Sequence, residues 1–195
     1  MTVVFDSGSG LFKAGFSGEK APRSVFRSYV GRQKYCSLPI DNDSKNYGDQ
    51  YIGDEATINS PFLISRYPIE HGVVENWYDE EKILKYAYKR LNIDSSDYPV
   101  LLTEPLMNPR ENSEKMIQVM FETFNVPTFY LSNQCFLSLY SSGKTTGVIC
   151  EVGDGVTQIM PIYNNKYVQG SAARLDIGGR DISEYLQILL SEHGY

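Results

Sequence analysis

Apolar positions along the chain predict short strands that alternate with amphipathic helices. Residues 75–91 carry apolar side chains at helical spacing among charged ones, and Asn76 is a suitable N-cap for that helix. The apolar run 99–103 is short and continuous, which is typical of a buried parallel strand. A further strand is predicted over 128–131. Helices that alternate with buried strands indicate an α/β protein.

The same pattern predicts three more helices. The second begins at Asn108 and Pro109, with Pro109 at the first helical position. Ser132 is the expected cap of the third helix, which Gly143 ends, and the last helix covers about 180–193. The expected apolar faces are Met116, Ile117, Met120, Phe121 and Phe124 in the second helix, and Ile182, Tyr185, Leu186, Leu189 and Leu190 in the last.

The N-terminal segment is predicted to form a strand, a tight glycine-containing turn and a second strand. β-Branched and aromatic residues at 3–5 and 11–16 flank the turn. Residues 24–30 read as a further strand. From 31 to 53 the composition shifts to Asn, Asp, Ser, Lys and Gly, which predicts a long polar loop.

One short sequence pattern occurs twice. Residues 4–11 read Val-Phe-Asp-Ser-Gly-Ser-Gly-Leu, and residues 149–156 read Ile-Cys-Glu-Val-Gly-Asp-Gly-Val. Each copy has two apolar residues, an acid, and two glycines separated by one residue. A Gly-x-Gly turn lets backbone N–H groups point inward and form an anion nest. Either turn alone is also consistent with an ordinary β-hairpin, and the pattern identifies no nucleotide base.

Polar side chains near the two turns extend this hypothesis to a Mg-nucleotide site. Ser9 adds a hydroxyl donor, and Lys13 on the outgoing strand can neutralise a phosphate. The acids Asp6 and Glu151 would repel phosphate unless a cation lay between them, and their hard oxygens suit Mg²⁺. If the two hairpins face each other, they form a clamp for a magnesium nucleotide.

Composition excludes several classes of protein. The 195 residues include 18 Lys and Arg and 24 Asp and Glu, a net charge of −6, which argues against a nucleic-acid binder. Apolar residues make up 42% and aromatic residues 13%, too many for a disordered chain. We expect no membrane span, since no apolar run reaches ~18 residues. Cys36, Cys135 and Cys150 form no metal or disulfide pattern, so a reducing intracellular compartment is expected.

Longer motifs resemble those of the actins over nearly the whole chain. The resemblance implies an α/β, actin-like ATPase (ribonuclease H-like) fold, with ATP or ADP and Mg²⁺ in the cleft between two halves. Residues 6–16 resemble the first phosphate loop of that family, and 67–72 resemble its sensor loop. Further matching motifs lie at 101–105, 108–109, 114–116, 120–125, 137–140, 145–147, 153–157 and 174–176.

Roles for individual residues follow from this resemblance. Asp6, Gln134 and Glu151 would hold hydrated Mg²⁺, and Gln134 would also orient the attacking water. Asp154 would reach the ribose. The residues implied to contact the nucleotide are Ser9, Gly10, Leu11, Lys13, Gly153, Asp154, Gly155, Val156 and Gly179.

The resemblance also divides the chain into parts of the actin fold. Residues 1–30 and 72–142 correspond to subdomain 1, 31–71 to subdomain 2, 143–178 to the start of subdomain 3, and 179–195 to the first helix of subdomain 4. The chain thus corresponds to the N-terminal half with an incomplete second half. We expect either a fragment of a longer product or other protein surfaces that cover its apolar faces.

Several positions depart from the actin pattern. Glu151 replaces the family Asp, and Gln158 replaces a His. An amide does not titrate near neutral pH, so we expect at most a slow ATPase. The first residues lack the acidic tail that meets myosin in actins, so ordinary motor binding is not expected. The loop 31–53, with Cys36, Leu38 and Ile40, is unlike the actin loop that contacts the next subunit.

The leading hypothesis is an actin-like structural subunit that works within a cytoskeletal or other multiprotein assembly. Its expected partners are other protein subunits, actin-like or assembly-specific, and neither nucleic acid nor membrane. The expected location is the cytoplasm and cytoskeleton, with the axoneme and the nucleus as alternatives. A conventional ATP-hydrolysing, filament-forming actin seen as a fragment, a nucleotide-free scaffold subunit and a small-molecule kinase of the same superfamily remain open alternatives.

Overall fold

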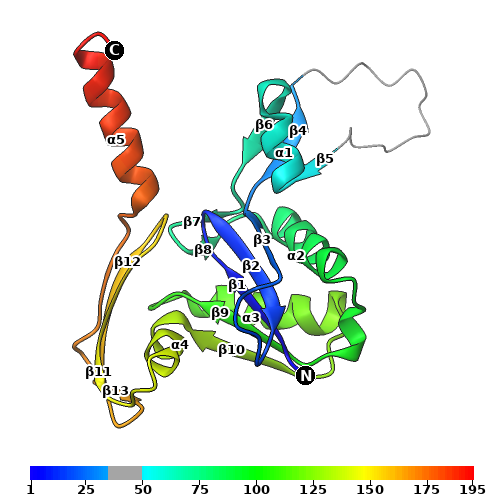
Figure 1. Ribbon diagram of the computed structural model, residues 1–195, viewed down its shortest axis with the longest axis vertical. Coiled ribbons are helices and arrows are strands. Elements are labelled where there is room, and N and C mark those ends of the chain that lie inside the picture. The colour runs from blue at the N-terminus through cyan, green and yellow to red at the C-terminus, as the bar shows by residue number, and fades with distance from the viewer. Residues whose placement is uncertain (35–49) are drawn as a thin grey trace.

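The computed structural model describes residues 1–34 and 50–195. Its largest sheet has five strands in the order β10-β9-β1-β2-β3 (Figure 1). The strands β1, β9 and β10 run parallel, whereas β1, β2 and β3 are antiparallel neighbours. The bounds of these strands are β1 Val3–Ser7, β2 Leu11–Phe16, β3 Ser24–Arg27, β9 Val100–Glu104 and β10 Phe129–Asn133.

The main core lies between this sheet and two helices. Helix α2 (Trp77–Leu91) begins at Asn76, whose side chain accepts the backbone N–H of Asp79 at 3.1 Å, as the sequence predicts. Helix α3 (Arg110–Gln118) continues as a π-helical turn, η3 (Val119–Thr123). The core side chains include Val3, Phe5, Phe12, Phe26, Ile83, Leu84, Tyr88, Leu102, Met116, Met120 and Phe124.

A second sheet forms a separate layer. It contains β11 (Gly147–Val152), β12 (Thr157–Tyr163), β13 (Lys166–Tyr167) and β14 (Ala173–Leu175). Helix α4 (Gln134–Ser141) packs against β11 and β12 and follows directly after β10 of the first sheet. The small core on this side consists of Leu106, Cys135, Leu139, Met160 and Ile162. Helix α4 therefore links the two sheets, since it follows the last strand of the first sheet and packs against the second.

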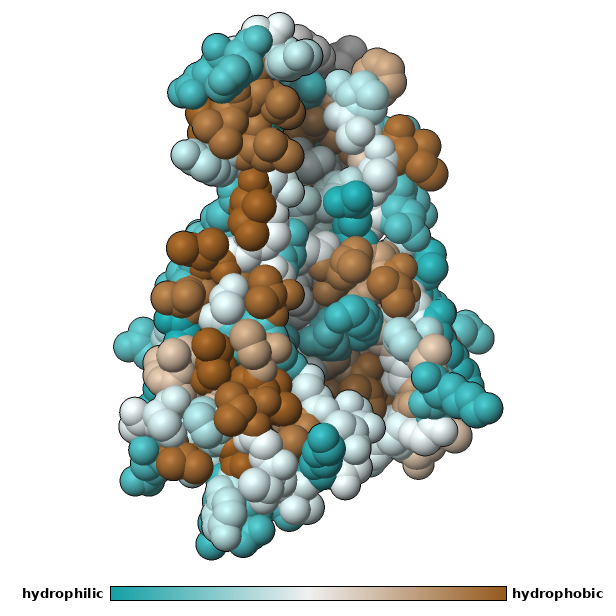
Figure 2. Space-filling view, turned by 60° about the vertical axis from the view of Figure 1, so that its left-hand side comes forward, coloured by the Kyte–Doolittle hydropathy of each residue, from teal (hydrophilic) through white to brown (hydrophobic). Residues whose placement is uncertain are grey.

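Helix α5 (Gly179–Glu192) extends away from the rest of the protein (Figure 1). None of its residues is buried, and the apolar stripe expected from the sequence is exposed, with Ile182 at 61% and Tyr185 at 62%. Figure 2 shows apolar side chains gathered over this helix and over the second sheet below it. None of the helices in residues 1–34 and 50–195 is long and apolar enough to cross a membrane.

A small subdomain lies beside α2. Arg32 of β4 forms a two-pronged ion pair with the buried Asp79 of α2, which attaches the subdomain to the core. The remaining elements are β4 (Val30–Gln33), β5 (Gln50–Ile52), α1 (Asp54–Ile58), η1 (Ser60–Phe62), β6 (Leu63–Arg66), β7 (Ile69–Glu70), β8 (Val73–Val74) and η2 (Ser95–Asp97).

The prediction of one strand over 24–30 is wrong, because these residues contribute to two strands, β3 and β4. The Ser28 N–H still bonds to the Gly10 carbonyl at 3.0 Å, in register with the β2–β3 pairing, and the chain then changes sheets, since Val30 pairs with Ile52 and Arg66 of the small sheet. The loop predicted over 31–53 is also wrong at both ends, which pair as β4 and β5. The predictions at Cys36, Leu38 and Ile40 lie outside the described residues.

Helix boundaries and faces need three further corrections. Ser132 belongs to β10, and Asn133 is the cap of α4, because its side chain accepts the Cys135 N–H at 3.0 Å. Pro109 is the N-cap residue of α3 rather than its first helical position. Ile117 and Phe121 are exposed, since the buried stripe consists of Met116, Met120 and Phe124, and Ile117 and Phe121 lie one position further round the helix.

Candidate functional site

Two glycine-containing turns border a cleft of about 1080 Å³ between the two sheets. The first turn joins β1 to β2, and the second joins β11 to β12. The Gly8 N–H donates to the Leu11 carbonyl at 3.2 Å, and the Gly153 N–H donates to the Val156 carbonyl at 2.8 Å. The same hydrogen bond, from the first glycine to the residue three positions on, closes both turns. The two copies of the repeated sequence pattern therefore form equivalent structures.

The two turns are in direct contact. A Cβ atom at Gly10 would lie 2.7 Å from Cγ of Asp154, and one at Gly155 would lie 2.7 Å from Oγ of Ser9. Neither position has room for a side chain, so glycine is required there by the close approach of the facing turn. The cleft is consequently lined by backbone at the point where the turns meet.

The turn between β7 and β8 supports both glycine turns. The Gly72 N–H donates to the Ser9 hydroxyl oxygen at 3.0 Å. Nδ1 of His71 lies 2.8 Å from the Gly155 carbonyl oxygen. A carbonyl only accepts hydrogen bonds, so the His71 ring carries a hydrogen on Nδ1. One short turn thus binds one residue of each glycine turn.

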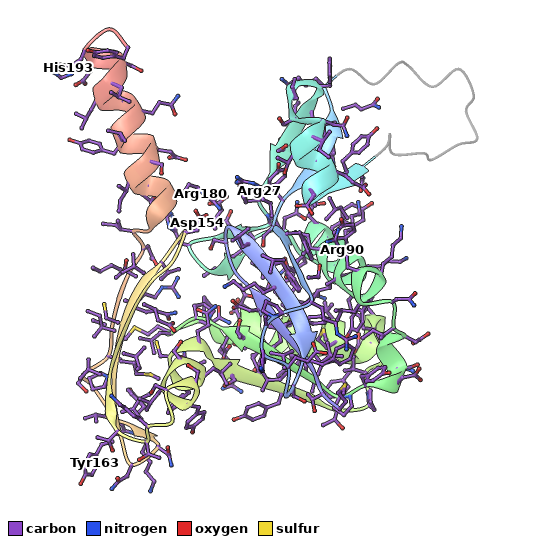
Figure 3. The ribbon with its side chains drawn as sticks, viewed as in Figure 1. Arg27, Arg90, Asp154, Tyr163, Arg180 and His193 are labelled. Carbon is purple, nitrogen blue, oxygen red and sulfur yellow. The ribbon has the colours of Figure 1, made fainter. Side chains whose placement is uncertain are left out.

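Arg180, at the start of α5, lies beside Asp154 of the second turn (Figure 3) and contacts both turns. Its guanidinium donates to the Ser9 carbonyl at 2.8 Å, to Oδ2 of Asp154 at 2.8 and 3.1 Å, and to Oε2 of Glu70 at 3.1 Å. It also lies over the Tyr67 ring, 3.8 Å from the centroid. One planar cation therefore contacts both turns and the segment between β6 and β8.

The first backbone N–H groups of α5 bind protein rather than facing the cleft. The Gly179 N–H donates to the Gly153 carbonyl and the Arg180 N–H to the Asp154 carbonyl, both at 2.9 Å. Gly179, which the resemblance places at the nucleotide, lies behind the second turn and is absent from the residues that line the cleft. Its contribution in this structure is to hold the second turn in place.

The floor of the cleft is polar and hydrogen-bonded around Asp6. Oδ1 of Asp6 accepts from the Thr103 hydroxyl at 2.6 Å and from Nε2 of Gln134 at 3.2 Å. Oδ2 accepts from Nζ of Lys13 at 2.9 Å. Strand pairing places Asp6 opposite Lys13, which explains their contact. This cluster brings together a carboxylate, a cation and an amide within reach of the first glycine turn.

Glu151 and Gln158 form the second polar cluster of the floor. They are paired directly across β11 and β12. The carboxylate of Glu151 accepts from the Ser138 hydroxyl and, at 3.0 Å, from Nε2 of Gln158. Nε2 of Gln158 also donates to Oε1 of Gln134 at 2.8 Å, and its Oε1 accepts the Leu106 N–H at 2.7 Å. Gln158 thus links the two clusters.

Cys135 contacts the same carboxylate from α4. Its Sγ lies 3.6 Å from Oε2 of Glu151, and the side chain is buried. Burial, reinforced by the negative charge of Glu151, raises the pKa of the Cys135 thiol to about 12. The thiol therefore stays protonated at neutral pH and acts as a weak donor rather than a nucleophile.

The cleft gathers most of the residues that the sequence nominated. The lining includes Asp6, Ser9, Gly10, Leu11, Lys13, Gln134, Glu151, Gly153, Asp154, Gly155, Val156 and Gln158. Sequence reasoning missed Arg180, Thr103 and Ser138. Ser138 could have been found, because it lies four residues after Gln134 on the same helix face. Arg180 and Thr103 come from distant segments and carried no local signal.

A comparison with protein-family models identifies the family of the chain. The model of the family described as Actin matches residues 1–194. Members of that family typically bind ATP or ADP with Mg²⁺. The mixed α/β architecture agrees with this match. We conclude that the chain belongs to the actin family.

Proposed function

We propose that the cleft binds the polyphosphate of ATP or ADP with Mg²⁺, and that the protein is an actin-like structural subunit with slow or no ATP hydrolysis. The observation that carries this proposal is the contact between two equivalent glycine turns at one cleft. Backbone lines the cleft at that contact, and turns of this kind present N–H groups to anions. A polyphosphate is long enough to contact both turns at once.

The side chains present fit a magnesium nucleotide. Ser9, Gly10, Leu11 and Lys13 would hold the β- and γ-phosphates, and the second turn would bind from the opposite side. Arg180 uses Oδ2 of Asp154, which leaves Oδ1 for a ribose hydroxyl. Asp6 offers hard oxygens for a hydrated cation. Bound Mg²⁺ supplies positive charge that offsets the phosphates and carboxylates.

Slow hydrolysis is proposed from the side chains at the cleft floor. Gln158, where the family has His, is 3% exposed and cannot titrate near neutral pH. Glu151 already accepts hydrogen bonds from Ser138 and Gln158, so its carboxylate is engaged with protein donors. Neither residue supplies a free base to a water molecule in the cleft.

The binding test uses Lys13→Met. Mg-ATP affinity, measured by fluorescence of a labelled ATP analogue, should fall about 10- to 100-fold, because a charge-assisted contact to phosphate is lost. Lys85→Met, in an exposed position of α2, is the matched control and should leave the affinity unchanged. An unmodified protein that binds no Mg-ATP, or equal affinities of the two variants, would contradict the proposed site.

The role as a subunit is supported by the exposed apolar face of α5. We propose that protein subunits of a cytoskeletal assembly cover this face, since apolar stripes of this size are normally buried against another surface. Sedimentation velocity of the full chain should show association that Ile182→Ser with Leu186→Ser weakens. A monomer that melts cooperatively without partners counts against this role. Pelleting that requires Mg-ATP would favour a conventional filament-forming actin.

A further inference from the structure

Every hydrogen-bonding group of the Gln158 amide has a partner. Its two Nε2 hydrogens reach Oε1 of Gln134 at 2.8 Å and Oε2 of Glu151 at 3.0 Å. Its Oε1 accepts the Leu106 N–H at 2.7 Å. The side chain is 3% exposed, so water does not compete for these bonds. The amide is therefore fixed in a single orientation.

This fixed orientation determines that of Gln134. Oε1 of Gln134 accepts from Gln158, and its Nε2 donates to Asp6 at 3.2 Å, with Thr103 at 3.4 Å. Turning the Gln134 amide over would place N–H against N–H at Gln158 and oxygen against the carboxylate of Asp6. Both ends of Gln134 therefore oppose rotation, and its carbonyl remains directed at Gln158.

We propose that Gln158 is a positioning residue that slows ATP hydrolysis in the cleft, because its amide donates a hydrogen bond to the carbonyl of Gln134 and holds that carbonyl in place. This inference rests on the proposed binding of ATP. In hydrolysis, the water oxygen bonds to the γ-phosphorus, and the bond to the bridging oxygen breaks with its electron pair leaving on ADP. A proton of the water passes to a phosphate oxygen or a base. A carbonyl that accepts that proton in a hydrogen bond orients the water, and here Gln158 takes one acceptor site of the Gln134 carbonyl and holds it pointed at itself rather than at a water in the cleft.

Glu151 in turn holds the Gln158 amide in place. Its Oε2 accepts from Gln158 and from the Cys135 thiol, and its Oε1 accepts from Ser138. These contacts hold the carboxylate beside the Gln158 amide, directly opposite it in the β11–β12 pairing. Glu151 thus acts on Gln134 through Gln158.

The primary test is Gln158→Met, which has similar length and no amide hydrogens. Single-turnover hydrolysis of ATP should rise about tenfold, since one competing hydrogen bond is removed. ATP affinity should change less than about threefold, because the glycine turns remain. The double variant Gln134→Ala with Gln158→Met should lose the gain. Gln169→Met, in an exposed turn, is the matched control and should behave as the unmodified chain.

A second variant guards against loss of folding in Gln158→Met, where the Leu106 N–H loses its acceptor. In Gln158→His, a neutral imidazole has one donor and one acceptor, so it cannot donate to both Glu151 and Gln134. The charged acceptor takes the donor, and the Gln134 carbonyl is released. Gln158→His should therefore hydrolyse ATP about tenfold faster than the unmodified chain as well.

A measurement without nucleotide separates this inference from the proposed function. A double-mutant cycle on Gln134→Met and Gln158→Met, measured by urea unfolding, should show at least about threefold coupling in the unfolding constant. If no variant binds ATP, the proposed function fails, and this cycle alone decides whether Gln158 holds Gln134. Absent coupling overturns the inference. So does an unchanged hydrolysis rate in both Gln158 variants that still bind ATP, or a gain that persists without Gln134.

Discussion

Glu80→Gln should raise the free energy of unfolding at pH 8 by about 3 kcal/mol. Glu80 lies on α2 and is completely buried. Oε1 accepts from the Ser7 hydroxyl at 2.7 Å, but Oε2 is buried without a hydrogen-bond partner. A buried carboxylate with one unpaired oxygen is destabilised by loss of water, whereas a neutral amide of the same shape carries no charge.

The pH dependence has a definite sign. Burial raises the pKa of Glu80 from 4.5 to about 7, and the Ser7 hydrogen bond offsets this only in part. Between pH 4.5 and about 7, the folded state therefore keeps a proton that the unfolded state has lost. The stability that this proton provides is complete below pH 4.5 and is lost as the pH rises through about 7. The unmodified chain loses stability across this window by up to ~1.4 kcal/mol per pH unit.

Urea unfolding at several pH values from 4.5 to 8 measures this effect. The stability difference between Glu80→Gln and the unmodified chain should grow across the window and stay constant above it. The slope of free energy on urea should not change, because the surface exposed by unfolding is the same. Glu81→Gln, the next residue on the helix and partly exposed, is the control. Parallel pH profiles for the unmodified chain and Glu80→Gln would show that Glu80 is ionised like an exposed acid.

Arg180→Met should cost about 2 kcal/mol of stability and lower Mg-ATP affinity about tenfold. The Arg180 side chain is 20% exposed and binds the Ser9 carbonyl, Asp154 and Glu70 together. Hydrogen bonds to charged groups contribute more than neutral ones, but Glu70 and Asp154 are about two-fifths exposed, and solvent weakens their attraction. Affinity falls because the second glycine turn is no longer tied to the first.

The matched control for this prediction is Arg110→Met on α3. Arg110 is 91% exposed and pairs with Glu114 one helical turn away, so its removal should change stability by less than about 0.5 kcal/mol. Thermal unfolding and titration with the labelled ATP analogue measure the two effects separately. Unchanged affinity in Arg180→Met would mean that the turns keep their contact without the arginine.

Local sequence was sufficient to predict the long helices and to identify the two turns that border the cleft. Asn76 and the apolar spacing after it predicted α2, since capping and amphipathic periodicity act within a few residues. The repeated glycine pattern predicted two equivalent turns, and both form with the same closing hydrogen bond. Pattern alone placed the third helix cap one residue early, because neighbouring Ser132 and Asn133 are both capable of capping.

Strand boundaries and side-chain partners depended on contacts that no local pattern encodes. Residues 24–30 satisfy strand propensity throughout, yet they are divided between two sheets, because 24–27 pair with β2 whereas Val30 pairs with β5 and β6. Ile117 and Phe121 are exposed beside the buried Met116, Met120 and Phe124, and apolar spacing alone does not show which of these neighbouring positions face the core. Propensity describes one residue, whereas the sheet that a strand joins is decided by the rest of the molecule.

The sequence by itself determined the α/β class, the main helices, the two glycine turns and the family, since these depend on local spacing and on motifs. Only the tertiary structure decided that the turns touch, that Arg180 joins them, and that Gln158 occupies the Gln134 carbonyl. The physical reason is that the contacting residues lie far apart along the sequence. Gln158 follows Gln134 by 24 residues, and Arg180 follows Ser9 by 171, so these contacts exist only after both sheets have formed and packed around α4.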